Sequence, residues 1–351
     1  MTASKPAESA RPASSGPTPK VGAGHGRVGV LLVNLGSPGK ADPSSVRRYL
    51  REFLSDPRVI ETPKVIWWPI LNLFVLARRP VRTAHAYRSV WNTERDEAPL
   101  IGITRSQAEK LGRALAGEGI LVDWAMRYAA PSIGSRVTAM IEAGCGRILI
   151  APLYPQYSAS TTATANDVAF ATLQKMRWQP AIRTLPAYYD HTVYIDALAT
   201  SLQAGLAKLA FEPELVLITY HGLPLSYIAA GDPYGDQCVA TTRLLRERLG
   251  WPESRLTITY QSRFGRAEWL GPYTEETIAE LAKGGTKRIV VMMPGFSSDC
   301  LETLEEMAVR NAELFREHGG EEYAAIPCLN DSPEGMSVIE AVVRRELSGW
   351  L

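Results

Sequence analysis

The sequence has almost no excess charge of either sign. Its 38 lysine and arginine residues nearly match its 37 aspartate and glutamate residues, which gives a formal net charge of +1 at pH 7. Proteins that bind nucleic acid depend on a strongly basic face. We therefore expect no nucleic-acid partner. The hydrophobic content of 46% and the charged content of 21% are ordinary for a globular enzyme.

Long apolar runs are also missing. No run approaches the roughly 20 residues that a membrane-spanning helix needs. Residues 1–26 are rich in Ser, Ala, Pro, Gly and Lys and contain no apolar stretch of the kind found in secretory signals. Such a segment cannot bury enough apolar surface to become ordered, so we expect it to be disordered. Together these absences indicate a cytoplasmic protein.

One shorter apolar segment, residues 65–77, leaves two interpretations open. Pro69 and Asn72 interrupt it, and Arg78 and Arg79 follow it. It could form a buried helix. Alternatively, residues 65–80 could form an exposed apolar lip that touches a membrane surface or an apolar ligand while the arginines meet anionic groups. The second interpretation would allow peripheral contact with the inner face of a membrane.

Cysteine is scarce, and the common nucleotide-binding and metalloprotease motifs are absent. The four cysteines form no CxxC pair, which is typical of free thiols in a reducing compartment; they are Cys145, Cys238, Cys300 and Cys328. There is no P-loop, no HExxH motif and no GxGxxG after the first predicted strand. The last absence argues against a nucleotide-dependent oxidoreductase.

The sequence does contain a repeated alternation of strand-like and helix-like segments. Apolar runs rich in Val and Ile predict strands at residues 28–34, 121–127, 146–152, 182–185, 214–220, 255–260, 287–293 and 323–326. Helical patterns are found near residues 43–54, 82–92, 104–117, 160–177 and 333–348. This alternation predicts an α/β fold made of two Rossmann-like halves, each a four-stranded parallel sheet flanked by helices, with a cleft between them.

The predicted domains follow from this pattern. Residues 27–186 form the first half, which carries the apolar lip, and residues 187–326 form the second. Residues 327–351 are expected to form a helix that packs back on the first half. The segments that start at Arg147 and Arg288 each contain a strand, a turn with Pro and an aromatic residue, and a hydroxyl-rich helix start, which suggests a duplication.

The strongest candidates for chemistry follow two predicted strands. His221 ends one strand, and Asp299 and Glu302 come shortly after another. Because open α/β sheets bind ligands at the carboxyl ends of their strands, we expect these side chains to face one cleft. A neutral imidazole accepts protons and binds metals. Glu306 lies four residues after Glu302 and extends the row of carboxylates along one helical face.

Structural roles remain open for the same residues. His221 could simply bond to a loop carbonyl. Asp299 could cap a helix, because Glu302 follows it at capping-box spacing. The carboxylate row could also face solvent.

A second group of candidates consists of arginines and aromatic residues. Arginine binds carboxylates through two parallel hydrogen bonds, and a tryptophan beside a Gly/Pro loop can either pack in the core or stack on a flat ligand. Any one arginine could equally be a solvated surface residue. The candidates are Arg79, Arg82, Tyr87, Arg127, Tyr128 and Trp269.

Six segments together resemble the ferrochelatase family, whose members insert ferrous iron into a porphyrin. The resemblance covers residues 27–348. Each segment alone is weak evidence, but all six in this order are specific. They are NLGSP at 34–38, RY at 127–128, YPQYSASTT at 154–162, YHGLP at 220–224, EWLGPYT at 268–274 and PGFSSDCLETL at 294–304.

The resemblance implies roles for individual residues. His221 would be the active-site histidine and Glu302 the carboxylate opposite it; both would be catalytic and contact the metal. Asp299 and Glu306 would form a path for protons or metal. Side chains expected to contact the porphyrin are Leu35, Arg79, Arg82, Tyr87, Arg127, Tyr128, Trp269 and Phe296. The apolar segment would correspond to the lip that contacts the membrane in some members.

The resemblance also implies which small molecules the protein uses. Fe²⁺ and porphyrin would be substrates, and no cofactor would be required. Some members carry a [2Fe–2S] cluster. One of its cysteine ligands lies in the segment that corresponds to YPQYSASTT at 154–162, and the others lie in a cysteine-rich tail. Here Ala159 replaces that cysteine and the tail has none, so no cluster is expected. Cys300 stands where several members have histidine.

The choice of porphyrin depends on the lip. We expect protoporphyrin IX, which would give protohaem in the terminal step of haem biosynthesis, because an apolar lip suits the more apolar ring. Coproporphyrin III is the alternative. A non-catalytic protein that binds a tetrapyrrole or metal, and a chelatase for cobalt or nickel, also remain open, since histidine and carboxylate ligands suit several divalent metals.

Overall fold

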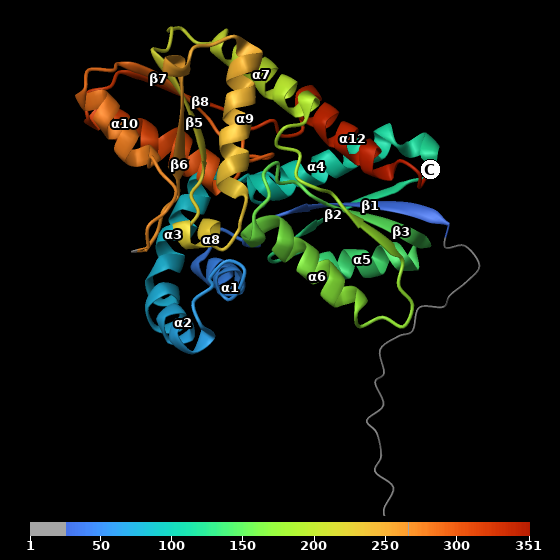
Figure 1. Ribbon diagram of the computed structural model, residues 1–351. Helices are drawn as coiled ribbons and strands as arrows, with labels where there is room; N and C mark the ends of the chain where they lie inside the picture. The colour runs from blue at the N-terminus through green and yellow to red at the C-terminus, as the bar shows by residue number, and fades with distance from the viewer. Residues whose placement is uncertain (1–25, 266) are drawn as a thin grey trace, which may run out of the picture.

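The computed structural model describes residues 26–265 and 267–351. Apart from Gly26, the tail predicted to be disordered lies outside the described residues. Two four-stranded parallel sheets form the centre of the molecule (Figure 1). The first contains β1 (Arg27–Asn34), β2 (Leu121–Met126), β3 (Cys145–Pro152) and β4 (Ala181–Thr184). The second contains β5 (Leu215–His221), β6 (Leu256–Gln261), β7 (Arg288–Met292) and β8 (Glu322–Ile326).

The two sheets have the same topology. Their strand orders are β2-β1-β3-β4 and β6-β5-β7-β8, so each strand of the first sheet has a counterpart in the second. The segments beginning at Arg147 and Arg288, which are similar in sequence, form the third strand of their respective sheets, β3 and β7. The predicted fold class of two Rossmann-like halves is therefore confirmed.

Helices cover both faces of each sheet. On the first half they are α4 (Pro99–Ala114), α5 (Ile133–Glu142) and α6 (Thr164–Leu173). On the second they are α7 (Thr192–Leu206), α8 (Leu225–Ala229), α9 (Tyr234–Leu249), α10 (Thr274–Lys283) and α11 (Asn311–Glu317). The last helix, α12 (Pro333–Leu347), packs between α4 and α7. The pattern predicted α4 to begin five residues late, because Pro99 at the first helical position starts the helix earlier.

One hydrophobic core joins the two halves. It contains residues from β1 and β3, from β5 and β7, and from α4, α7, α9 and α12. The outer faces of the sheets have cores of their own, under α5 and α6 in the first half and under α10 and α11 in the second. The carboxyl ends of β3 and β7 also meet, since the Ser297 hydroxyl donates to the Leu153 carbonyl at 2.7 Å. The two halves thus present their carboxyl edges to one region.

A third group of helices projects from the first half. It consists of α1 (Pro43–Leu54), α2 (Lys64–Ile70), the π-helix η1 (Leu71–Val75) and α3 (Leu76–Val90), drawn in blue in Figure 1. The pattern predicted α3 to begin only after Pro80. The helix instead runs through this proline, since Leu76 and Ala84 on either side are fully buried against α1 and their packing outweighs one lost backbone hydrogen bond.

The apolar segment in this group is exposed. Val65 is 87% exposed, Trp68 66%, Leu73 68% and Phe74 63%, whereas Leu71 is buried. The interpretation as a buried helix is therefore wrong: residues 65–80 form an apolar lip in which most large apolar side chains are exposed and Leu71, Leu76 and Pro80 are buried. Within the described residues no helix is both long and apolar enough to cross a membrane.

Candidate active site

His221 lies at the carboxyl end of β5, as its place in the sequence predicted. Its Nδ1 atom is 2.7 Å from the Gly222 carbonyl oxygen. A carbonyl can only accept a hydrogen bond, so Nδ1 carries a proton, and in the neutral form of the ring the lone pair is on Nε2. A side chain at Gly222 would meet the Gln261 carbonyl and the Trp269 ring at 3.0 Å each. Glycine therefore lets Trp269 pack directly beside the histidine turn.

Glu306 is a buried carboxylate on the π-helix η5 (Glu302–Arg310). The Ser262 amide donates to its Oε1 at 2.9 Å and the Ser262 hydroxyl to its Oε2 at 2.7 Å. The Arg310 guanidinium lies 3.6 Å away. Burial raises the pKa of Glu306 above its ordinary value of 4.5, against the opposing effect of Ser262 and Arg310; the charge of Glu302 raises this pKa further and His221 lowers it.

Glu302 is half-buried and lies where η5 meets α3. Burial, and then the nearby charge of Glu302, raises the pKa of the Tyr87 hydroxyl. The pKa values of Tyr49 and Cys300 are likewise raised by burial first, with Glu302 contributing. Gln261 pairs with His221 and bonds to the Glu302 carbonyl, and the next residue, Ser262, bonds to Glu306, so the structure brings the three predicted residues into one neighbourhood.

Asp299 has a different setting. It is 6% exposed, and both of its carboxylate oxygens are occupied. Oδ1 accepts from the Thr303 hydroxyl at 2.9 Å and from the Cys328 amide, and Oδ2 accepts from the Asn330 side chain at 2.6 Å. The capping-box interpretation is wrong, because the Asp299 amide donates to Asn330 and not to Glu302. Asp299 joins the loop after β7 to the loop after β8.

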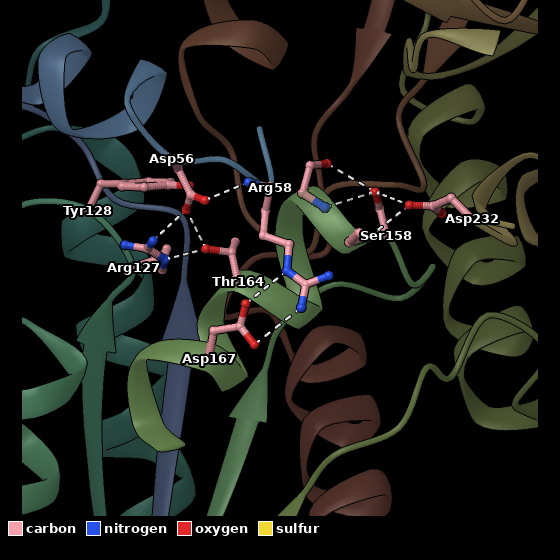
Figure 2. A network of polar contacts seen from close by, with 10 residues as sticks. Asp56, Arg58, Arg127, Tyr128, Ser158, Thr164, Asp167 and Asp232 are labelled. Atoms are coloured by element: carbon pink, nitrogen blue, oxygen red, sulfur yellow. Dashed lines mark hydrogen bonds and ion pairs between the residues drawn. The ribbon is translucent and has the colours of Figure 1, made fainter. Parts of the chain in front are cut away.

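Arg127 and Tyr128 belong to a buried polar network (Figure 2). Its centre is Asp56, which is 6% exposed. The Arg127 guanidinium, the Tyr128 hydroxyl and the Thr164 hydroxyl all donate to Asp56 Oδ2, the tyrosine at 2.8 Å. The guanidinium also lies over the Tyr128 ring, 4.3 Å from its centroid. Tyr128 is fully buried, so it lies behind the site wall and supports it.

The two arginines at the end of the lip and Tyr87 differ in their exposure to solvent. Arg79 and Arg82 are exposed on α3, whereas Tyr87 is 5% exposed beside Glu302. The Arg79 guanidinium lies 5.2 Å from the centroid of the Phe264 ring, and this ring packs against Trp269, also with 5.2 Å between centroids. The guanidinium is partly desolvated although the residue as a whole is exposed, and this desolvation, followed by the charge of Arg82, lowers the pKa of Arg79. The Arg79–Phe264–Trp269 stack links α3 to the histidine turn.

Leu35 and Phe296 occupy the two carboxyl edges. Leu35 is half-buried against the core of α1 and α3, and its carbonyl accepts from the Tyr128 amide at 2.9 Å. Phe296 is half-buried at the edge of the second-half core. Leu35 follows β1, an inner strand of the first sheet, and Phe296 follows β7, an inner strand of the second sheet.

Sequence reasoning missed three residues. Asp56 and Ser262 carry no motif that marks them, because their partners lie 71 and 44 residues away in the chain. Tyr154 does lie within one of the quoted segments. Its hydroxyl is buried and has no hydrogen-bond partner among the described residues. Burial raises the pKa of this hydroxyl, the charge of Arg127 opposes the rise, and Cys300 adds to it.

The cysteines are all free. Cys145, Cys238 and Cys300 are buried and Cys328 is half-buried. Among residues 26–265 and 267–351, no three or more His, Cys, Asp or Glu side chains gather closely enough to hold a metal ion.

Comparison with known proteins identifies the family. The ferrochelatase family model matches residues 27–347. The ferrochelatase of Rhizobium meliloti (strain 1021) is 60% identical over 93% of this chain and 97% of its own length, and that of Methylocella silvestris is 55% identical over the full length of both. The solved structure of SirB from Bacillus subtilis with Fe³⁺ has a TM-score of 0.54 at 13% identity, covering 91% of this chain and 95% of that chain, which shows a shared fold. This chain therefore belongs to the ferrochelatase family.

Proposed function

We propose that the site formed by His221, Glu302 and Glu306 is where this ferrochelatase inserts Fe²⁺ into protoporphyrin IX and releases two protons. The product is protohaem, in the terminal step of haem biosynthesis. The observation that supports this site most directly is that one strand end contacts all three residues. Gln261 pairs with His221 and its side-chain amide lies 3.4 Å from the Glu302 carbonyl oxygen, and the adjacent Ser262 holds the buried carboxylate of Glu306.

The chemistry required is a proton-for-metal exchange. Two pyrrole protons must leave as one divalent cation enters, so the total charge of the macrocycle is unchanged. With Nδ1 bonded to Gly222, the His221 Nε2 atom is free to accept a pyrrole proton or to bind the metal. Glu302 and Glu306 supply negative charge for the arriving cation or the departing protons. A substrate metal that moves onto the porphyrin nitrogens needs no complete ligand set from the protein.

The remaining contacts suit a flat, partly anionic ligand. Phe264 is half-buried and backed by Trp269, which is 6% exposed, and Arg79 and Arg82 offer guanidinium groups that can bind propionates bidentately. Asp299 and Tyr128 are committed to buried hydrogen bonds. We assign these two to supporting roles, in place of the proton path and the porphyrin contact that the resemblance implied.

The decisive experiment removes the imidazole. His221→Ala should lower anaerobic turnover with Fe²⁺ by roughly 10²–10⁴-fold, the usual loss of a proton acceptor, while porphyrin still binds. His318→Ala is the matched control, because its Nδ1 also bonds a backbone carbonyl, Leu314, but it lies at the end of α11. Normal turnover in His221→Ala would remove the histidine from the mechanism.

Two further variants test the other walls of the site. Glu302→Gln should lower kcat more than it weakens porphyrin binding, because the negative charge of Glu302 assists the exchange of pyrrole protons for the metal. Arg79→Ala should raise the KM for porphyrin with little change in kcat, since it removes binding that is equal in ground and transition states. An unchanged KM would exclude Arg79 as a propionate contact.

Porphyrin choice is settled by steady-state comparison of protoporphyrin IX with coproporphyrin III. The exposed apolar lip favours the ring with fewer carboxylates. A higher kcat/KM for coproporphyrin III would reassign the substrate without changing the site. Binding of either ring without metal insertion would instead identify a tetrapyrrole-binding protein.

We also propose that the exposed lip contacts anionic membrane surfaces and that the protein is a peripheral protein of the cytoplasmic side. Trp68 and Phe74 present large apolar faces beside basic residues of α3. Replacing both with serine should abolish cosedimentation with anionic phospholipid vesicles and leave the melting temperature unchanged. Phe170→Ser, on helix α6 outside the lip and 43% exposed, is the control.

The protein should also work without an iron–sulfur cluster. Three of its four cysteines are buried, and burial holds the pKa values of Cys238 and Cys300 well above the ordinary range. Purified protein should therefore contain no labile sulfide and retain full turnover. Stoichiometric sulfide together with iron would contradict this.

A further inference from the structure

The end of β6 has an unusual backbone. Ser262, the first residue after this strand, has a φ of +65°. Residues other than glycine seldom adopt positive φ values, and such conformations cluster where the surrounding structure requires them. At Ser262 that conformation turns both the backbone amide and the side-chain hydroxyl toward the same carboxylate.

That carboxylate is Glu306. The amide holds Oε1 at 2.9 Å and the hydroxyl holds Oε2 at 2.7 Å, so each oxygen has its own donor. Two donors from one residue fix both the position and the plane of the carboxylate. Arg310, at 3.6 Å, adds charge but less orientation.

The residue before Ser262 connects the same strand end to the other two site residues. Gln261 pairs with His221 in the parallel ladder, and its carbonyl accepts from the Gly222 amide at 2.8 Å. Its side-chain amide lies 3.4 Å from the Glu302 carbonyl oxygen. The strand end at 261–262 is therefore bonded to His221's turn, to the start of η5 and to Glu306.

We propose that Ser262 is a positioning residue for metal insertion, which fixes the Glu306 carboxylate relative to His221 and Glu302. With the backbone amide alone, Oε2 would be held only by the Arg310 guanidinium at 3.6 Å, and the hydroxyl adds the short hydrogen bond that fixes its position. The inference rests on the proposed function of the site. It adds a residue that touches neither metal nor porphyrin and acts only through Glu306.

The first test is a double-mutant cycle of Ser262→Ala and Glu306→Gln, with kcat and both KM values measured for Fe²⁺ and porphyrin. Ser262→Ala should lower kcat about tenfold, the scale of one lost hydrogen bond to a charged group, with the porphyrin KM nearly unchanged. In the Glu306→Gln background the same change should have no further effect. An equal loss in both backgrounds, or no loss in the first, would overturn the proposal.

A second variant separates positioning from folding. Ser262→Gly keeps the backbone donor, removes the hydroxyl and relieves the positive φ. It should raise the melting temperature or leave it unchanged while kcat falls as far as in Ser262→Ala. Full kcat in Ser262→Gly would show that turnover does not need the hydroxyl, and this would overturn the proposal. If the wild-type protein itself inserted no iron, the proposed function would fail, and this outcome is distinct from any result of the Ser262 variants.

Discussion

At the scale of single residues, Asp56 shows how one buried charge organises a wall of the site. Burial alone would raise its pKa, but hydrogen bonds from Thr164, the Arg58 amide and Tyr128, together with the charge of Arg127, lower it below the ordinary value of 3.8. Asp56 is therefore ionised in the folded protein across the neutral range. Its charge is what holds Arg127 and Tyr128 in place.

Replacing Asp56 with asparagine should destabilise the protein at pH 7 by roughly 3–5 kcal/mol, because the Arg127 charge is left buried without its partner. A lowered folded-state pKa means that the stability from ionised Asp56 is present above the unfolded-state pKa and is lost as pH falls through the folded-state value. The gap in melting temperature between wild type and Asp56→Asn should therefore narrow below about pH 3.8. A gap that is constant with pH would contradict the assigned charge.

Gly36 explains the glycine of the first sequence segment. It has a φ of +109°, and a side chain there would approach the Tyr128 carbonyl oxygen to 2.1 Å. Gly36→Ala should therefore lower the melting temperature sharply and reduce turnover by shifting Leu35 and the Arg127–Tyr128 turn. Gly39→Ala is the matched control in the same loop, because nothing lies within 4 Å of the added carbon. Equal effects of the two changes would refute the close-approach argument.

At the scale of elements, each half has a π-helix after a corresponding strand of its sheet. The segment η3 (Ala159–Ala163) follows β3, and η5 follows β7, its counterpart in the second sheet. The lip contains the third, η1. Wide helical turns of this kind are rare and are frequently found at functional sites. The hydrophobic pattern predicted ordinary helices here, since a π-turn differs from an α-turn by one residue and leaves almost the same periodicity.

The short helix α8 is hydrogen-bonded to the backbone of residues 59–61, just before the lip. The Tyr227 hydroxyl donates to the Val59 carbonyl at 3.0 Å and accepts from the Glu61 amide at 3.1 Å. Asp232, just after α8, makes a similar link between the halves, accepting from the Ser158 hydroxyl and the Ala159 amide (Figure 2). Because α8 begins four residues after His221, these bonds tie the lip and η3 to the histidine loop.

Tyr227→Phe should raise the KM for porphyrin several-fold with kcat nearly unchanged, because the lip is then held less firmly over the site. The melting temperature should fall only slightly, since both bonded backbone groups lie near solvent and can bind water. Steady-state kinetics at varied porphyrin concentration give the comparison. Tyr188→Phe, a buried tyrosine of the shared core, should leave the KM unchanged.

At the scale of the whole molecule, the shared core makes the two halves depend on each other. The helix α12 fills the space between α4 and α7 and contributes Leu347, which is fully buried. The chain end is then fastened to the first sheet. The Arg183 guanidinium donates to the Glu346 and Ser348 carbonyls and stacks on the Trp350 ring at 4.3 Å.

Leu347→Ala should destabilise the protein by roughly 2–5 kcal/mol, the usual cost of deleting a large buried side chain. Because the core spans both halves, we expect one unfolding transition at a lower temperature and not separate melting of one half. Near-ultraviolet circular dichroism and calorimetry should give the same midpoint temperature for this transition. Leu351→Ala, which alters a leucine that is 62% exposed in the same tail, should have no measurable effect.

The sequence by itself determined the strands, their grouping into two halves and the place of His221, because runs of β-branched residues and the turns that end them are local properties of the chain. It also marked Glu302 and the lip as candidates. Only the tertiary structure decided that Asp299 is held by Asn330 while Glu306 is held by Ser262, and that the lip is exposed. These outcomes depend on which distant donor reaches each carboxylate and on which surfaces are left uncovered, and neither is encoded in local spacing.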